Sequence, residues 1–171
     1  MDIEHSNSLR NVDRARDAYL KLSNDKSLSS KERSSLRNDI IEQDKKGISI
    51  SAMLFNAKDI TAEEQERAID ALIVLGYAEY ILLSPKTLST ITLPQREKII
   101  DYVAGKGDGD VASGILDSPT WKSLSGDERK KILQTITRTG QSPIFKIPLF
   151  AKIAEGFSEE ERQIVFSTPS S

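Results

Sequence analysis

The sequence predicts an all-α protein, an array of about four and a half helix-pair repeats that is either α-solenoid-like or a compact multi-helix bundle. Two observations support this prediction: one helix-start motif recurs five times at steps of 31 to 33 residues, and apolar residues at helical spacing follow each copy. The motif is an apolar residue, Ser or Thr, two variable residues, Glu or Gln, and then Arg or Gln. Its copies begin at Leu28, Ile60, Ile91, Leu124 and Phe157.

The motif has the chemistry of a capping box, an arrangement that starts α-helices. The Ser or Thr side chain accepts a hydrogen bond from the backbone N–H three residues later. The Glu or Gln at that later position accepts one from the backbone N–H of the Ser or Thr. Each such cap contributes about 1 kcal/mol of stability. We therefore expect helices that start near residues 29, 61, 92, 125 and 158.

Glycine is expected to end the first four helices, because it adopts the left-handed backbone conformation without steric cost. These glycines are Gly47, Gly76, Gly105 and Gly140. A shorter apolar stretch lies between each glycine and the next motif, and we predict a second helix there, over residues 48–57, 77–83, 111–116 and 147–153. Residues 8–22 have the pattern of an amphipathic helix that would close the array.

These patterns predict one domain. We expect a flexible tail over residues 1–7, a single all-helical domain over residues 8–167 and a flexible end over residues 168–171. An irregular bundle of evenly sized helix pairs would give similar spacing, so it remains the alternative to a true repeat.

The composition disfavours most catalytic chemistry. The 171 residues include no Cys and a single His, His5 in the predicted tail, so disulfides, zinc sites and a Ser-His-Asp triad are not expected. We predict no metal and no cofactor. The formal net charge of −2 and the pI of about 5.6 argue against a nucleic-acid partner. No apolar stretch approaches the roughly 18 residues of a membrane span. We therefore expect no membrane insertion and a cytoplasmic location, with leaderless secretion as an alternative.

Two places are candidates for ligand or acid–base chemistry. Residues 105–110 match neither a calcium loop nor a phosphate loop, and we expect a flexible linker between helices there. Glu79 is the nearest candidate for a general acid, since glycoside hydrolysis needs only two carboxylates flanking a cleft. We expect instead a partly exposed Glu79 on a short helix.

The candidate partner-binding residues are Trp121, Phe145 and Phe150. Trp121 is the sole tryptophan and precedes the fourth motif, where it either packs between units or forms a binding hot spot. Phe145 and Phe150 belong to residues 143–150, an apolar segment with two prolines. This segment is either a docking surface or is buried under the last helix.

The leading hypothesis is a non-catalytic protein–protein interaction module, because a helical array presents an extended surface to another macromolecule. A bacterial or phage helper, an immunity-type inhibitor and the targeting domain of a larger toxin are settings that fit. Two alternatives stay open. One is a small, muramidase-like hydrolase that uses Glu79 with a second carboxylate. The other is a secreted effector whose Ser-rich residues 1–8 and 23–35 form a disordered export signal.

Overall fold

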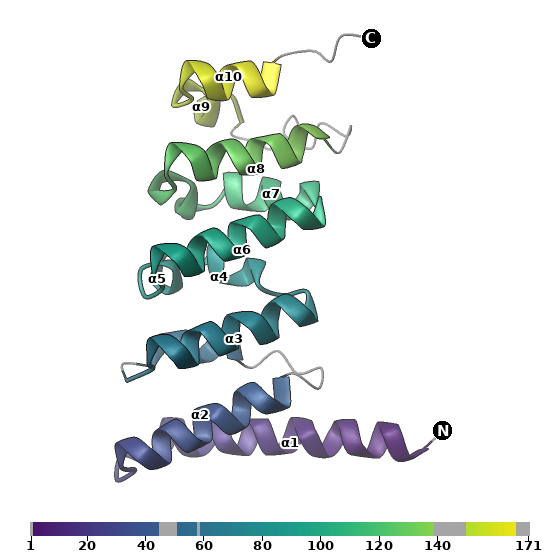
Figure 1. The fold of residues 1–171 in the computed structure, drawn as a ribbon, viewed down its shortest axis with the longest axis vertical. Coiled ribbons are helices and arrows are strands. Elements are labelled where there is room, and N and C mark those ends of the chain that lie inside the picture. Colours follow the sequence, from purple (N-terminus) through teal and green to yellow (C-terminus); the bar gives the residue numbers. More distant parts are fainter. Residues whose placement is uncertain (1, 45–50, 58, 139–149, 167–171) are drawn as a thin grey trace.

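The computed structural model describes residues 2–44, 51–57, 59–138 and 150–166 (Figure 1). Over these ranges the chain consists of ten α-helices and two 3-10 helices without a strand, which confirms the all-α prediction. The elements are α1 (Asp2–Asn24), α2 (Ser30–Asp44), η1 (Ser51–Asn56), α3 (Ala62–Leu75), α4 (Glu79–Leu83), α5 (Pro85–Leu88), α6 (Leu93–Lys106), α7 (Gly109–Leu116), η2 (Pro119–Ser123), α8 (Gly126–Arg138), α9 (Phe150–Glu155) and α10 (Glu159–Phe166).

Five of these helices, α2, α3, α6, α8 and α10, lie one above another in chain order along the long axis of the molecule (Figure 1). Each of them contacts the next, and we call them the stacking helices. Units 1 to 5 are numbered after them in order. Helix α1 packs against α2 and closes the N-terminal end of the stack. That the units are copies of one repeat stays a prediction from the sequence.

Every stacking helix begins at the residue after its predicted cap, and all five capping boxes are formed in both directions. In unit 2, the Glu64 N–H donates to Thr61 Oγ1 at 3.2 Å and the Thr61 N–H donates to Glu64 Oε2 at 2.9 Å. These bonds satisfy backbone groups that the first turn of a helix leaves without intrahelical partners.

The helix ends follow the sequence less closely. Gly76 ends α3 in the left-handed conformation with a φ of 84°, as predicted. Helix α6 instead continues through Gly105 and ends at Gly107, with a φ of 66°. The prediction of Gly105 was wrong because Gly107, two residues later, also offers this conformation. Gly47 and Gly140 lie outside the described residues.

The predicted linker over residues 105–110 is a tight turn. Gly107 ends α6, and the Asp108 side chain caps α7 by accepting hydrogen bonds from the Asp110 and Val111 N–H groups at 3.1 Å. The linker therefore has a defined conformation that starts a helix.

The N-terminal helix and the second helices also differ in their bounds from the predictions. Helix α1 begins at Asp2 rather than at residue 8, so residues 2–7 belong to it and are not a separate tail. No Gly or Pro interrupts this stretch, and Asp2 and Glu4 carry the charge favoured at the start of a helix. The predicted second helices correspond to η1, α4, α7 and α9.

The eighth residue after each cap shows how the surroundings change along the stack. Ile69, Ile100 and Leu133 hold this position in units 2 to 4, and each is 0% exposed. Unit 1 has Arg37 there, 2% exposed, whereas unit 5 has Phe166, 54% exposed. At this position the middle units are apolar and buried, whereas the side chain is charged in unit 1 and exposed in unit 5. Among the described helices, none has the length and apolar composition required to cross a bilayer.

Candidate functional site

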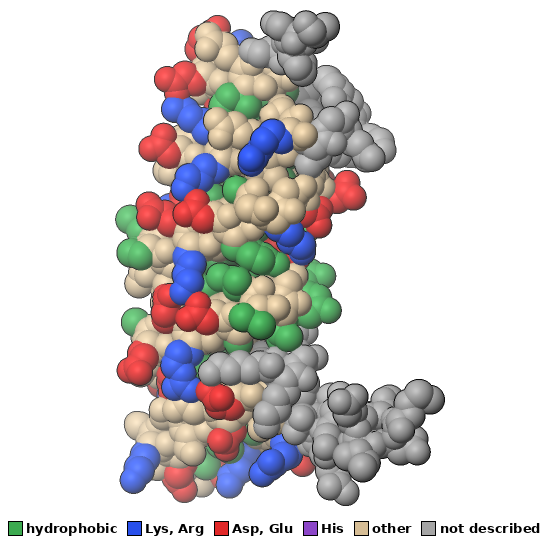
Figure 2. All heavy atoms as spheres, turned by 45° about the vertical axis from the view of Figure 1, so that its right-hand side comes forward, with side chains coloured by type: hydrophobic (Ala, Val, Ile, Leu, Met, Phe, Trp, Pro, Cys, Tyr) green, Lys and Arg blue, Asp and Glu red, His purple; other side chains and the backbone are tan. Residues whose placement is uncertain are grey.

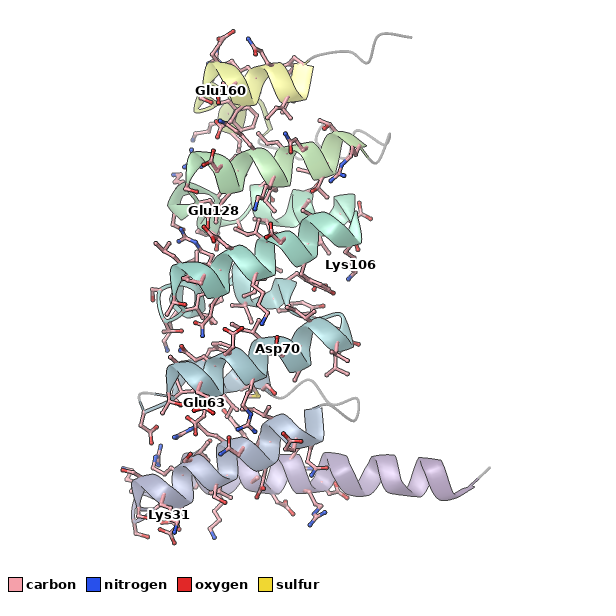
Figure 3. All side chains as sticks on the ribbon, in the orientation of Figure 1. Lys31, Glu63, Asp70, Lys106, Glu128 and Glu160 are labelled. Carbon is pink, nitrogen blue, oxygen red and sulfur yellow. The ribbon has the colours of Figure 1, made fainter. Side chains whose placement is uncertain are left out.

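The stacking helices begin at one edge of the molecule and end at the opposite edge. Figure 3 shows Glu63, Glu128 and Glu160 at the first edge and Lys106 at the second. We call these the capping edge and the distal edge. They carry different chemistry: the capping edge holds a network of charges between units, and the distal edge exposes apolar side chains.

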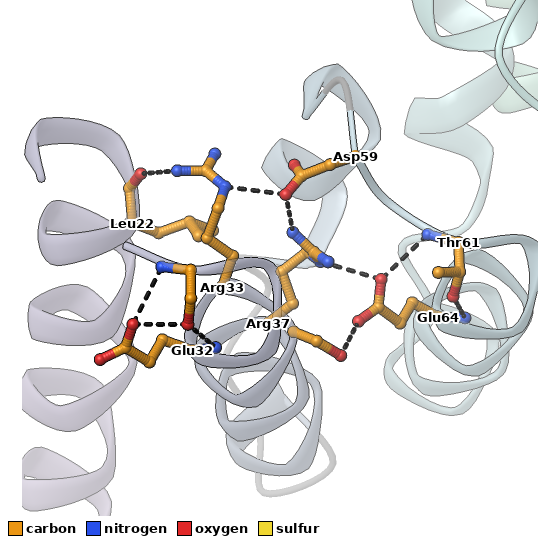
Figure 4. A network of polar contacts seen from close by, with 9 residues as sticks. Leu22, Glu32, Arg33, Arg37, Asp59, Thr61 and Glu64 are labelled. Atoms are coloured by element: carbon orange, nitrogen blue, oxygen red, sulfur yellow. Dashed lines mark hydrogen bonds and ion pairs between the residues drawn. The ribbon is translucent and has the colours of Figure 1, made fainter. Parts of the chain in front are cut away.

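At the capping edge, the junction between units 1 and 2 is built around a buried carboxylate (Figure 4). Glu64 is 4% exposed and accepts hydrogen bonds from Arg37 Nε at 2.9 Å and Ser34 Oγ at 2.6 Å, besides the one from the Thr61 backbone. Arg37 Nη1 also forms an ion pair with Asp59 at 3.0 Å. The charged side chains of this junction are therefore paired across the two units.

Burial alone would raise the pKa of Glu64. The hydrogen bonds from Ser34, Thr61 and Arg37 outweigh that effect, so the pKa lies below its usual value and the carboxylate stays charged. Arg37 was not among the residues predicted from the sequence. Aligning the five motifs would have revealed it, since Ile or Leu fills its position in units 2 to 4.

Arginine has the same role at the next charged junction. Arg96 of unit 3 donates from Nε and Nη2 to the two carboxylate oxygens of Glu128 in unit 4, at 2.6 and 3.0 Å. Arg129 of unit 4 lies 4.0 Å from the carboxylate of Glu161 in unit 5. In both pairs the arginine is the fourth residue after one cap, and the glutamate is the third residue after the following cap.

The junction between units 2 and 3 contains the same two positions without charge. Both are glutamine, Gln65 and Gln95. Gln65 Nε2 donates to the Thr90 carbonyl at 3.0 Å, and Gln95 Nε2 donates to the Ala62 carbonyl at 3.1 Å. The Gln95 side-chain oxygen still completes the capping box at Thr92. At these positions neutral amides therefore bind backbone carbonyls, whereas the next two junctions have an arginine and a glutamate there.

The distal edge exposes four apolar side chains between residues 74 and 83. Val74, Tyr77, Tyr80 and Leu83 are 78%, 42%, 57% and 37% exposed, and we call them the Tyr77–Tyr80 patch. The two tyrosine rings lie 6.0 Å apart. Figure 2 shows hydrophobic side chains gathered at mid-height of the stack on this side of the molecule. Exposed apolar clusters of this kind are typical of binding surfaces.

The left-handed turn at Gly76 places this patch. The Gly76 and Tyr77 N–H groups donate to the Ile73 and Leu72 carbonyls, which ends α3 and turns the chain into α4. Ala78 then faces the core with no exposed surface, whereas Tyr77 and Tyr80 on either side of it face solvent. The hydrogen bonds at the end of α3 and the burial of Ala78 thus fix the position of the two tyrosines.

A small polar cluster links the patch to unit 3. Glu79 is 6% exposed, which corrects the expectation of a partly exposed side chain. Its Oε1 accepts a hydrogen bond from Lys106 Nζ at 3.3 Å, and its Oε2 is buried without a hydrogen bond. Lys106 Nζ also lies 5.9 Å from the centre of the Tyr102 ring. The expectation failed because α6 of the next unit covers α4.

These contacts shift two pKa values. Burial, and then the negative charge of Glu79, raise the pKa of Tyr102. Burial acts to lower the pKa of Lys106, but its hydrogen bond to Glu79 and the negative charge around it together outweigh this effect and raise the pKa. Both groups therefore keep their ordinary protonation states near neutral pH: a neutral phenol and a charged ammonium.

Trp121 lies in η2 and is 6% exposed. Its ring packs edge-on against Phe157 of unit 5 at 6.0 Å, and the guanidinium of Arg129 lies 5.3 Å from its centre. Packing between units is therefore one role of Trp121. The ring also lines a pocket of about 520 Å³. The other lining residues are Leu116, Asp117, Ser118, Pro119, Lys122, Arg129, Lys152, Ile153 and Gly156.

The other candidate residues are less informative. Phe145 lies outside the described residues, and of Phe150 only its place at the start of α9 is described. Partner binding by Trp121, Phe145 and Phe150 stays a prediction. The Ser-rich residues proposed as an export signal belong to α1, to the turn after it and to the start of α2. Within the described ranges, no three Asp, Glu or His side chains are grouped closely enough to hold a metal ion.

No protein-family model, curated protein or solved structure matches this chain.

Proposed function

We propose that this protein is a non-catalytic protein–protein interaction module that binds its partner through the Tyr77–Tyr80 patch. The observation that supports this most directly is the pair of exposed tyrosines, whose rings lie 6.0 Å apart. Val74, three residues before Tyr77 in the chain, is 78% exposed as well. Tyrosine is enriched in binding hot spots because its ring buries a large apolar area while its hydroxyl can still form a hydrogen bond.

The surroundings of the patch favour binding over a role in the core. Ala78, Ile81 and Leu82 of the same segment are at most 1% exposed and already fill the interior. Glu79 and Lys106 fix the segment to unit 3. Preorganised surfaces bind more tightly because less conformational entropy is lost on binding.

The test compares capture by the wild type with capture by a Tyr77→Ala/Tyr80→Ala variant, using extract of the native host and mass spectrometry. Leu93→Ala is the matched control, since Leu93 is 64% exposed and lies outside the patch. We expect a protein that the wild type and the control both capture and the double variant does not. All three chains should unfold at similar temperatures, because exposed side chains contribute little to stability.

Two results would contradict the proposal. One is a set of captured proteins that is the same for the double variant and the wild type. The other is a loss of capture that the Leu93→Ala control shows equally.

A further inference from the structure

The outer face of α10 repeats the features that bind the following unit elsewhere in the stack. The fourth residue after the cap contacts the next unit in units 1 to 4. Arg33 donates to Asp59 at 2.7 Å, Gln65 to the Thr90 carbonyl at 3.0 Å and Arg96 to Glu128 at 2.6 Å. Arg129 lies 4.0 Å from Glu161. Unit 5 has Arg162 at this position.

Arg162 makes only part of the contacts of its equivalent in unit 4. Arg129 Nη2 donates to the carbonyl seven residues before it, that of Lys122, at 3.2 Å, and its Nη1 points to Glu161 of the next unit. Arg162 Nη2 makes the first contact, to the Glu155 carbonyl at 3.4 Å. Among the described residues Arg162 has no acidic partner corresponding to Glu161.

Phe166 lies four residues further along the same face of α10, since residues four apart share a helix face. Its equivalents in units 2 to 4, Ile69, Ile100 and Leu133, are fully buried, and Phe166 is 54% exposed. At the other end of the stack, α1 covers α2. The described stack is therefore closed at α1 and presents a junction-like face at α10.

We propose that this face of α10 docks a helix of a partner protein that runs parallel to α10 and begins with a Ser/Thr-x-x-Glu capping box. The capping glutamate would pair with Arg162, and an apolar face would cover Phe166. Charge complementarity supports this occupant, because Arg96 and Arg129 meet such a glutamate within the chain. A second copy of this chain fits less well, since α1 covers the first stacking helix.

The probe is a helix-stabilised, fluorescently labelled peptide that copies residues 124–138, the segment that begins with the Ser125 cap and whose Glu128 meets Arg96. Its affinity for the full chain is measured by fluorescence anisotropy. We expect Arg162→Gln in the protein to weaken binding about tenfold, the effect of removing a hydrogen bond to a charged group. Glu128→Gln in the peptide should weaken it equally, and the two changes together should weaken it little further.

The matched control is Arg138→Gln in the protein, which removes an exposed arginine at the far end of α8 and should leave the affinity unchanged. Three outcomes would overturn the proposal. They are no binding at peptide concentrations of about 1 mM, binding that is insensitive to Arg162→Gln, and binding that falls with Arg96→Gln instead. The last would place the peptide on α6. This face is separate from the Tyr77–Tyr80 patch, so neither test depends on the other.

Discussion

The junctions between units 2 and 3 and between units 3 and 4 bury the same two positions but balance charge differently. Glu128 is 5% exposed and is paired with Arg96 through two hydrogen bonds. Gln95, at the position of Glu128, is 4% exposed, and both it and Gln65 donate their side-chain amides to backbone carbonyls. A buried charge is costly unless it is paired, and a neutral amide needs only hydrogen-bond partners. The comparison indicates a charge-matching rule: where the third residue after a cap is glutamate, the fourth residue after the previous cap is an arginine of opposite charge, and where one is neutral the other is neutral too.

Breaking the charged junction should have the largest effect. We expect Arg96→Gln to lower the free energy of unfolding by about 3 kcal/mol, because it leaves the buried Glu128 carboxylate without its partner. Urea denaturation followed by circular dichroism measures the loss.

Two further variants sharpen this test. Lys131→Gln removes a pair with Asp101 in which both side chains are about half exposed or more, and it should cost less than about 1 kcal/mol. Arg96→Gln/Glu128→Gln imitates the two glutamines of the junction between units 2 and 3 and should recover most of the stability lost in the single variant. A loss for Arg96→Gln no greater than that for Lys131→Gln would contradict the charge-matching rule.

Placing a charge at the uncharged positions Gln65 and Gln95 should have the next largest effect. Gln95→Glu places a carboxylate at a buried position, and Gln65 of unit 2 holds the position that Arg96 holds in unit 3, so no arginine is there to pair with it. We expect a loss of about 2 kcal/mol in the free energy of unfolding. Adding Gln65→Arg should restore much of it, because the pair then resembles Arg96 and Glu128. If Gln65→Arg fails to improve the Gln95→Glu variant, the backbone positions of the two junctions differ more than their shared motif implies.

The smallest expected effect is a difference in response to acid. The pKa of Glu64 is lowered in the folded state, so its contribution to stability is complete above the ordinary pKa and is lost as pH falls below about 4.5. Glu64→Gln should be less stable than the wild type at pH 7 and should lose less stability between pH 7 and acid.

The matched control for the acid response is Glu63→Gln, which changes an exposed neighbour in the same first turn. In urea denaturations at a series of pH values, the free energy of unfolding of this variant should change with pH as steeply as that of the wild type. If the free energy of unfolding of Glu64→Gln falls with pH as steeply as that of the wild type, protonation of groups other than Glu64 causes the loss of stability in acid.

Contacts within one turn of the chain were accessible from the sequence. The starts of the five stacking helices and the turn at Gly76 all depend on residues close together in the chain. The end of α6 was misplaced because two nearby glycines are equally able to end a helix. The Tyr77–Tyr80 patch was missed because a short apolar stretch does not reveal which side chains a neighbouring unit covers.

The sequence by itself determined where the helices start, since a capping box joins residues three apart and its energy is local. Only the tertiary structure decided which capping residue meets an arginine, because these contacts join residues 27 to 32 apart. The burial of Glu79 by the next unit was likewise decided by stacking. Bringing such distant side chains together requires the whole stack of helices, whose packing no single stretch of sequence specifies.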